Sequence, residues 1–403
     1  MIERNIYLDR LKDFIDKPQI KILTGIRRSG KSTVLRLLHR LLLERGVSDS
    51  QIILINLESF AYADLKSAPQ LYAWIQERID PIQKSYLLLD EIQQIHEWEK
   101  AVNSFLVDFN VDVYITGSNS HLLSSDLATY LAGRYVEIPI YTLSFSEFQL
   151  FREKNFPQES ENEKSLQAYI HRGGFPVIHT APYNEETAYQ VVRDIYSSVI
   201  LRDTIQRYRI RELELLDRLI RYAFDNIGNT FSGKNVADYF KRQQRKVDIN
   251  TVYNYLHALE GAFILYRVPR YDIKGKEILK TLEKFYVADI SLIHATMGYR
   301  GRIISGILEN IVFLELKRRG YQVYVGKLDQ REIDFVAEKP GERQYIQVAY
   351  LLESATTIER ELSPLLSIRD NYPKYLLSLS PLAHDTIEGI YHLSLEEWLL
   401  ADQ

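Results

Sequence analysis

Short apolar runs alternate with amphipathic stretches through the first 140 residues of the chain. The apolar runs are bounded by polar residues or glycine, which is typical of buried strands, and they cover residues 21–24, 51–56, 85–90, 112–116 and 135–140. Helical spacing of apolar positions occurs at residues 7–15, 33–43, 68–79, 100–108 and 121–131. This alternation predicts an α/β fold with a doubly wound parallel sheet.

The first predicted strand runs into a glycine-rich loop, and a helix follows. The loop has the form Gly-x-x-x-x-Gly-Lys-Ser, a Walker A motif in the strand–loop–helix context that it requires. Its backbone N–H groups and the helix N-terminus attract phosphate. Lys31 then reaches the β- and γ-phosphates, and Ser32 ligates Mg²⁺. A chance glycine-rich turn before a surface helix is the alternative. The predicted nucleotide-binding residues are Gly25, Ile26, Arg27, Arg28, Ser29, Gly30, Lys31, Ser32 and Thr33.

The third predicted strand ends in Asp90, and Glu91 follows directly. An aspartate in this place can hold Mg²⁺ through water, and the adjacent glutamate can polarise the attacking water. The alternative is an Asp-Glu pair that only ends a strand and caps a helix. Because a P-loop precedes it in this chain, the pair predicts the second half of an ATPase site. Asn119 follows the fourth strand and is predicted to orient the same water or contact the γ-phosphate, with Ser118 and Thr116 as competitors.

The composition of the chain limits which ligands, cofactors and cellular locations are possible. A chain of 403 residues is long enough for several domains, and its net charge of −4 restricts any nucleic-acid site to a local patch. The absence of cysteine excludes disulfides, thiol catalysis and cysteine-based zinc sites. The charged N-terminus has no signal-peptide core, and no apolar run has the length of a membrane span, so we expect a cytoplasmic protein with no membrane contact.

The middle of the chain predicts a winged-helix domain. Three helices are expected at residues 213–227, 232–240 and 250–260, followed by a hairpin at residues 262–282. Between residues 193 and 246, twelve Lys and Arg residues stand against seven Asp and Glu residues. We therefore expect DNA contacts from the basic turn between Lys241 and Lys246 and from the helix between Asn250 and Glu260. Contact with a protein through the same domain is the alternative.

The C-terminal part is similar to the restriction-endonuclease-like fold. A helix at residues 303–319 carries Glu309, and Asp334 lies in the second of three strands that follow. In that fold a Glu-x-Lys pattern on the next strand completes a Mg²⁺ site. Gln347 and Ala349 occupy those two positions here, so no lysine follows in the pattern. We expect a degenerate nuclease-like domain that serves binding or assembly.

The order of the motifs resembles that of the prokaryotic AAA-type ATPases of the P-loop (ASCE) class. The similar segments are the Walker A loop, LLLDE at 87–91, ITGSNS at 115–120, LAGR at 131–134 and LSFSEF at 143–148. GGFP at 173–176 and the segment 199–211 resemble the subfamily that has a C-terminal nuclease-like domain. The resemblance implies an ATPase core at 1–160, a helical lid at 161–208, a winged helix at 209–285 and the nuclease-like domain at 286–403.

The resemblance also implies roles for single residues. Arg134 matches a candidate arginine finger, which acts on the nucleotide of a neighbouring subunit and so implies a homo-oligomeric ring. A surface ion pair with Glu137 or Glu147 is the alternative. Asn56 matches a polar residue that restrains the catalytic glutamate. Adenine rather than guanine is assumed from the same resemblance.

Together these observations predict an ATP-hydrolysing AAA-type ring motor that acts on DNA, in remodelling, translocation or branch migration. Lys31 and Ser32 would bind phosphate and Mg²⁺, Asp90 would support the metal, and Glu91 would be the base. An ATP-dependent regulatory switch of defence or signalling, which assembles on a protein partner, is the alternative. Gln347 argues against a third hypothesis, an ATP-fuelled nuclease.

Overall fold

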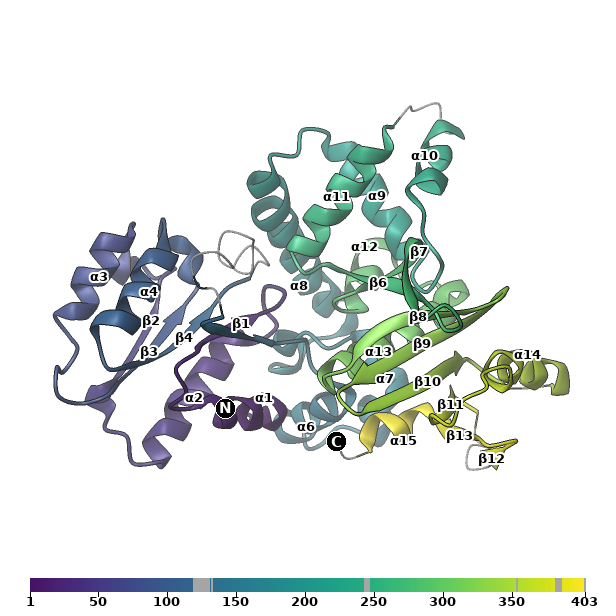
Figure 1. Cartoon of the computed structure of the whole chain (residues 1–403), viewed down its shortest axis with the longest axis horizontal. Coiled ribbons are helices and arrows are strands. Elements are labelled where there is room, and N and C mark those ends of the chain that lie inside the picture. The colour runs from purple at the N-terminus through teal and green to yellow at the C-terminus, as the bar shows by residue number, and fades with distance from the viewer. Residues whose placement is uncertain (119–130, 132, 243–246, 353, 381–385, 402–403) are drawn as a thin grey trace. The chain divides into compact units, whose positions relative to one another are not determined.

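The computed structural model of the chain describes residues 1–118, 131, 133–242, 247–352, 354–380 and 386–401. The chain divides into two compact units (Figure 1). The first unit comprises Met1–Thr142 and Gly261–Phe263, and the second comprises Leu143–Glu260 and Ile264–Gln403.

A five-stranded sheet, parallel throughout, forms the centre of the first unit. Its strand order is β2-β3-β4-β1-β5. The parallel pairing confirms the predicted α/β sheet, and it brings the carboxyl ends of the strands to one edge, where ligands bind in such sheets. The strands are β1 (Ile20–Thr24), β2 (Ile52–Asn56), β3 (Ser85–Asp90), β4 (Val111–Thr116) and β5 (Tyr135–Pro139).

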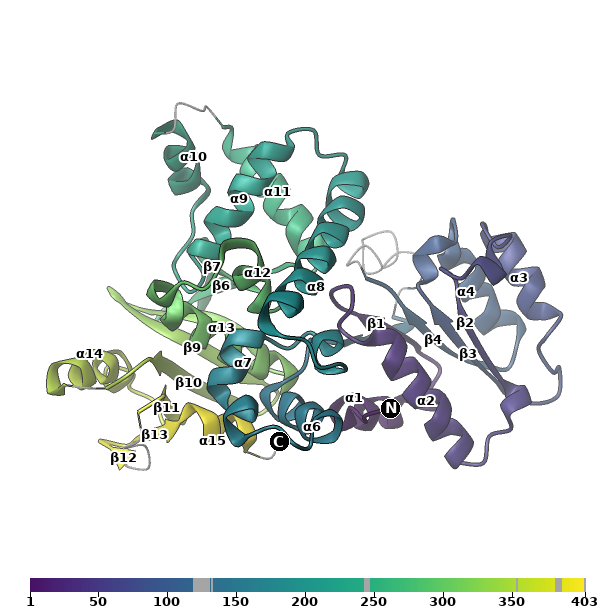
Figure 2. The same cartoon turned by 180° about the vertical axis from the view of Figure 1, so that it is seen from behind.

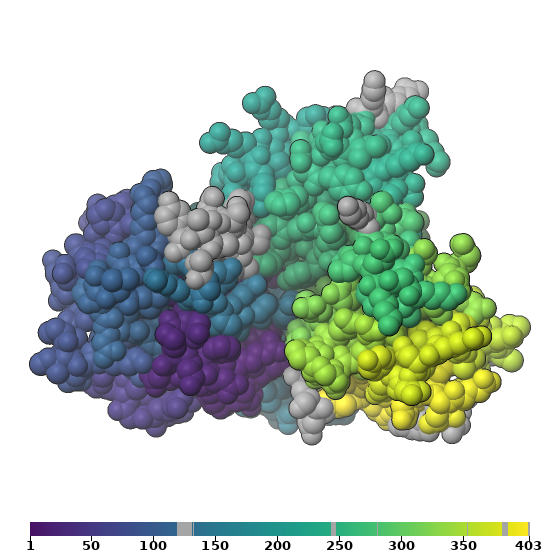
Figure 3. Space-filling model, in the orientation of Figure 1, coloured from purple at the N-terminus to yellow at the C-terminus, as the bar shows by residue number. Residues whose placement is uncertain are grey.

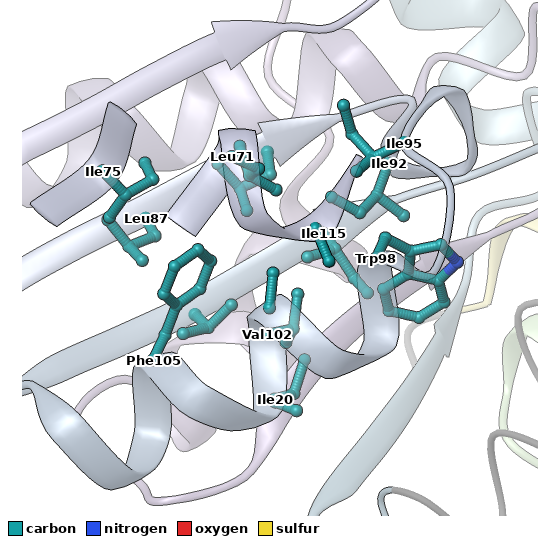
Figure 4. Packing of buried hydrophobic residues seen from close by; sticks show 14 of the residues in the cluster. Ile20, Leu71, Ile75, Leu87, Ile92, Ile95, Trp98, Val102, Phe105 and Ile115 are labelled. Carbon is teal, nitrogen blue, oxygen red and sulfur yellow. The ribbon is translucent and has the colours of Figure 1, made fainter. Parts of the chain in front are cut away.

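Helices cover both faces of this sheet (Figures 1 and 2). Alternate residues of β3 point to opposite faces: Leu87 and Leu89 pack with α3 (Ala68–Gln76) and α4 (Trp98–Asp108), while Leu88 packs with α1 (Asn5–Phe14) and α2 (Lys31–Glu44). Figure 4 shows the first of these two cores, in which Phe105 and Trp98 of α4 lie against strand side chains. The predicted helix at 121–131 lies outside the described residues, apart from Leu131.

The second unit contains helices before, between and after its strands. They are α6 (Phe145–Asn155), α7 (Leu166–Arg172), α8 (Glu185–Ser198), the π-helix η7 (Val199–Gln206), α9 (Leu213–Asp225), α10 (Gly233–Arg242), α11 (Ile249–Gly261), α12 (Ser291–Met297), α13 (Ile304–Arg318), α14 (Ala355–Leu366) and α15 (Leu395–Leu400). The helices α9, α10 and α11 agree with the three that the apolar spacing predicts. In the part of the chain that the structure describes, no helix has the length and apolarity needed to cross a membrane.

A mixed eight-stranded sheet follows, with the order β12-β13-β11-β10-β9-β8-β6-β7. In Figure 3 the residues of the later strands and of the helices α14 and α15, coloured light green and yellow, lie together. α13 contacts β7 to β10, and α14 contacts β9, β10, β11 and β13. The strands are β6 (Leu265–Asp272), β7 (Glu277–Val287), β8 (Gln322–Leu328), β9 (Arg331–Lys339), β10 (Glu342–Ala349), β11 (Lys374–Ser378), β12 (Thr386–Ile387) and β13 (Ile390–Ser394).

The hairpin predicted as a wing is the edge of this sheet. β6 and β7 pair antiparallel, as a wing would, but β6 also pairs in parallel with β8, with Arg270 opposite Val325. The expected domain boundary after residue 285 therefore falls inside β7. Local sequence pattern predicts the hairpin itself, whereas its pairing with a strand some 55 residues further along the chain depends on the tertiary fold.

An ion pair is buried at the other edge of the first unit's sheet, where the strands begin. Lys21 Nζ lies 2.5 Å from Asp112 Oδ1, and neither side chain is exposed. Lys21 also donates to the carbonyl of Lys17 at 2.7 Å, while Asp112 accepts from the N–H of Asp16 at 2.8 Å and from the hydroxyl of Tyr114 at 3.0 Å. Burial lowers the pKa of Lys21, because it disfavours the charged ammonium group. The carboxylate of Asp112 offsets part of this effect, so the charged lysine depends on its partner.

Replacing Lys21 by methionine should destabilise the first unit strongly. The substitution leaves the Asp112 carboxylate buried without its cation, which costs about 3–5 kcal/mol of unfolding free energy. Urea unfolding followed by far-UV circular dichroism measures the change. Lys12→Met is the matched control, because its ion pair with Asp9 is exposed. Equal unfolding midpoints for the two variants would contradict the role of the buried pair.

Candidate nucleotide-binding site

The loop between β1 and α2 can form only with glycine at its ends. Gly25 has φ +136° and Gly30 has φ +104°, a region that side chains disfavour. A Cβ on Gly25 would lie 2.2 Å from the carbonyl oxygen of Ile140. The backbone therefore curls tightly between Thr24, which ends β1, and Lys31, which begins α2.

The ammonium group of Lys31 lies inside this loop. Its Nζ donates to the carbonyl oxygens of Gly25, at 2.9 Å, and Ile26, at 3.1 Å, and the residue is only 3% exposed. A phosphate group entering the loop would offer a charged acceptor to the same ammonium, and charge-assisted hydrogen bonds are stronger than those to neutral carbonyls. The loop and its lysine are thus arranged to accept a phosphate chain.

Arg4 supports the loop from the N-terminal segment. Its guanidinium is 1% exposed and donates to the carbonyls of Ser29, at 2.8 Å, and Tyr141, at 3.0 Å. The same guanidinium lies 4.5 Å from the ring centroid of Tyr7, whose hydroxyl accepts from the N–H of Tyr141 at 3.0 Å. Sequence reasoning missed Arg4, because nothing local distinguishes it from a surface arginine.

Asp90 lies at the end of β3 and joins three neighbouring segments. It accepts hydrogen bonds from Ser32 Oγ at 3.1 Å, Thr116 Oγ1 at 2.6 Å and Asn56 Nδ2 at 2.9 Å. The sequence-predicted Mg²⁺ residues, Ser32 and Asp90, are therefore adjacent. A hydroxyl and a carboxylate are oxygen donors of the kind that Mg²⁺ prefers, so these residues fit the ion.

Glu91 adopts the left-handed conformation, with φ +57°. Its N–H donates to Thr116 Oγ1 at 2.9 Å, and its carboxylate accepts from Gln93 Nε2. The expectation that Asn56 restrains Glu91 is wrong, because Asn56 lies opposite Asp90 in the β2–β3 register and its amide bonds to that aspartate. Gln93 is the residue that contacts the glutamate.

The structure does not bring Arg134 to the loop of its own chain. Arg134 precedes β5, and its carbonyl accepts from the N–H of Ile20, at the beginning of β1. Its guanidinium is exposed and donates to Asn103 Oδ1 at 2.9 Å. Among the described residues it forms no ion pair, so the proposed pairs with Glu137 and Glu147 are absent. Asn119 lies outside the described residues and stays a prediction.

Of its two competitors, Thr116 is already bonded to Asp90 and Glu91. The hydroxyl of Ser118 is buried and has no hydrogen-bond partner within the described part of the chain. Of these two candidates, Ser118 is therefore the one whose hydroxyl could still form a hydrogen bond to a ligand.

Two family models match the chain. Residues 17–149 match a model described as an AAA domain, and residues 163–302 match a domain of unknown function (DUF8612). The first match covers the loop, Asp90 and Glu91. The chain therefore contains a P-loop AAA-type ATPase domain.

The chain also matches curated proteins over most of its length. It is 40% identical to an uncharacterized protein of Haemophilus influenzae over 402 residues, which is 99% of each chain. It is 30% identical to the uncharacterized protein MJ1544 of Methanocaldococcus jannaschii over 357 residues, 85% of this chain and 77% of that one. The chain belongs to the same family as these two proteins.

Solved structures show weaker similarity. The RuvB Holliday junction branch migration motor of Thermotoga maritima is 17% identical, with a TM-score of 0.35 over 66% of this chain and 90% of that chain. AMPPCP-bound DnaA from Aquifex aeolicus is 14% identical, with a TM-score of 0.31 over 64% and 86%. These similarities are too weak to add to the family assignment.

The C-terminal sheet contains a second cluster of ionisable side chains. Lys284 Nζ, on β7, lies 3.0 Å from Glu309 Oε2 of α13, 2.9 Å from Glu332 Oε1 and 3.4 Å from Asp334 Oδ1 of β9. The sequence pattern contains no lysine for this site, because Lys284 comes from a preceding strand and not from the Glu-x-Lys position. Gln347 contacts Asp334 and donates to Glu361 at 3.2 Å.

The lysine in this cluster stays charged although it is buried. Burial disfavours its ammonium, yet the carboxylates of Glu309, Asp334 and Glu332 raise the pKa of Lys284 above its ordinary value. Burial, together with Asp334, raises the pKa of Glu309 to about 8. Within the described ranges, no group of three or more acidic, histidine or cysteine side chains is arranged to hold a metal ion. The ammonium instead occupies the space between Glu309 and Asp334.

Gly25→Ala should weaken nucleotide binding at least about tenfold. The new Cβ would meet the carbonyl oxygen of Ile140 and force the loop open. Binding of a fluorescent ATP analogue measures the effect. Gly46→Ala is the control: Gly46 also has a positive φ, but a Cβ there meets nothing within 4 Å. Unchanged affinity of the Gly25 variant would show that the loop is not the phosphate site.

Proposed function

We propose that the chain hydrolyses ATP with Mg²⁺ and works as an AAA-type ring motor on DNA. The observation that carries the ATPase part is the meeting of Lys31, Ser32, Asp90 and Glu91 at the carboxyl edge of one parallel sheet. Lys31 and Ser32 come from the start of α2, Asp90 and Glu91 from the end of β3, and each has the chemistry that phosphoryl transfer to water requires.

In this proposal, Lys31 binds the β- and γ-phosphates, and Ser32 and Asp90 would hold Mg²⁺. When bound, the ion would neutralise part of the negative charge of the phosphates. Glu91 accepts a proton from the attacking water as the bond from the γ-phosphorus to the β–γ bridging oxygen breaks. ADP leaves with that oxygen, and the water oxygen stays on phosphate.

Arg134 supports the ring part of the proposal. Its side chain is exposed and precedes β5, at the edge of the sheet where β1 begins, whereas the phosphate loop lies where β1 ends. An arginine in that position can stabilise γ-phosphate charge only on the nucleotide of another subunit. Ring assembly would then couple hydrolysis in one subunit to the contacts of the next.

The helices α9 to α11 support the DNA part of the proposal. Exposed cations without an ion pair to any described carboxylate lie on α10 and in the segment just before α9: Arg209, Arg211, Lys234, Lys241 and Arg242. On α11, Asn254 and His257 are exposed, whereas Tyr253 is held against Gly233 of α10. Phosphate contacts by such cations would give binding that weakens steeply with salt.

The contact between Gln93 and Glu91 favours the second candidate function, a regulatory switch that assembles on a protein partner in its ATP-bound state. A glutamate held by an amide is less available to polarise water, so turnover would be slow. The two functions differ in whether nucleic acid increases the rate.

Glu91→Gln should retain ATP binding and lose turnover by a factor of about 10² or more, because an amide cannot accept the proton from water. Phosphate release measures turnover, and equilibrium binding of a fluorescent ATP analogue measures affinity. Glu97→Gln, an exposed glutamate paired with Lys100, is the matched control. Turnover retained by the Glu91 variant would exclude Glu91 as the base.

The steady-state ATPase rate should rise when DNA is added. Phosphate release is measured without DNA and with single-stranded, duplex and four-way-junction DNA at equal phosphate concentration. A motor couples hydrolysis to its track, so at least one DNA form should raise the rate several-fold. A slow rate that none of these forms changes would support the switch and overturn the motor.

A further inference from the structure

A polar groove of about 1060 Å³ opens on the second unit, beside the carboxyl end of α14. Two hairpin tips form part of its wall: the turn between β6 and β7, with Lys274 and Lys276, and the turn between β8 and β9, with Arg331. The segment that follows α14 forms another part, with Arg369 and Tyr372. The groove thus lies within one unit and is built by elements about 100 residues apart.

Positive charge predominates in this groove. Five cationic side chains line it, against only two carboxylates, those of Asp329 and Asp370. Both carboxylates already have partners: Lys274 lies 2.6 Å from Asp329, and Asp370 accepts from the hydroxyl of Tyr345 at 2.6 Å. They are therefore poorly placed to neutralise the remaining cations.

Lys276 and Arg369 are exposed and pair with no described carboxylate. Arg331 donates to neutral acceptors only, the carbonyl of Ser363 at 3.2 Å and the hydroxyl of Ser367. Three cations that converge on one groove repel one another, and in a chain with a net charge of −4 such a concentration favours a polyanionic ligand.

An aromatic side chain stands at the same groove. Tyr372 is 45% exposed, and the guanidinium of Arg343 lies 5.3 Å from its ring centroid. Arg343 is in turn held by Glu338 and by the hydroxyl of Tyr271, at 3.3 Å. An exposed tyrosine backed by a fixed guanidinium is a platform on which a flat, unpaired base can stack.

We propose that this groove binds single-stranded nucleic acid, with Lys276, Arg331 and Arg369 on its phosphates and Tyr372 stacked on a base. The combination of unpaired cations and an exposed ring matches how proteins hold single strands without reading sequence. A duplex would offer phosphates but no free base face, so the ring favours a single strand. The inference rests on the proposed function only in that both assign nucleic acid to this chain.

The test is fluorescence anisotropy of a labelled 12-nucleotide oligothymidylate with the full chain, without ATP, at several salt concentrations. Lys276→Glu combined with Arg369→Glu should weaken binding at least about tenfold and reduce the salt slope by about 1.4, the value for two lost contacts to a single strand. Tyr372→Ala should weaken binding about tenfold with an unchanged slope, because it removes stacking and no charge.

Two controls keep the result specific to the groove. Lys66→Glu combined with Lys154→Glu makes the same charge change at exposed positions elsewhere, and Tyr391→Ala removes a ring that is 48% exposed on β13. Both should bind like the unmodified chain. The groove assignment is overturned if the groove variants bind as tightly as these controls, or if a polyglutamate of equal charge competes as well as the oligonucleotide.

A further variant separates this inference from the proposed function. Lys241→Glu combined with Arg242→Glu removes two of the cations on α10 that the proposed function assigns to DNA, whereas the groove inference requires the loss of oligothymidylate binding in the groove variants. If this variant loses binding while the groove variants retain it, the groove inference fails and DNA contact through α9 to α11 stands. If the unmodified chain binds no oligonucleotide, the groove inference fails, while DNA-stimulated ATPase activity remains a separate measurement.

Discussion

The buried carboxylate of Asp90 is the contact on which the arrangement of the nucleotide site depends. Hydrogen bonds from Ser32, Thr116 and Asn56 converge on it from the start of α2, the end of β4 and the end of β2. These bonds form only when β2, β3 and β4 pair in the observed parallel register, because a shift of one residue would turn each side chain to the opposite face. Asp90 is bonded to Ser32, which follows Lys31, and it directly precedes Glu91. It therefore fixes the positions of Lys31 and Glu91 relative to each other.

The three lysines that are buried in the described part of the chain have different surroundings. At one edge of the first sheet, Lys21 and Asp112 neutralise each other and stabilise the fold. At the carboxyl edge, Lys31 donates to the carbonyls of Gly25 and Ile26, inside the loop where a phosphate chain would bind. In the second unit, Lys284 lies among carboxylates and occupies the space between Glu309 and Asp334. Of these three lysines, Lys31 is the one that lies in the Walker A motif.

Much of the first unit could be predicted, because its signals are local. Short apolar runs predicted the five strands, and the Walker A loop predicted a turn that excludes side chains at Gly25. The sequence does not predict side-chain contacts correctly where a residue's partner lies on another strand. Asn56 was expected to contact Glu91, yet the register places it on Asp90, and Gln93, two residues after Glu91, takes that role. The predicted wing is a sheet edge for the same reason: strand pairing is non-local.

Consecutive residues are enough to predict the class of chemistry, because a Gly-x-x-x-x-Gly-Lys-Ser loop follows one strand and an Asp-Glu pair follows another. The distant side chains that complete each site are known only once the chain has folded. Arg4 reaches the loop carbonyl of Ser29, Lys284 reaches Asp334, and two hairpins meet the end of α14 to form a basic groove. The physical reason is that backbone conformation follows from neighbouring residues, whereas side-chain contacts across a sheet depend on strand order and register, which no short segment encodes.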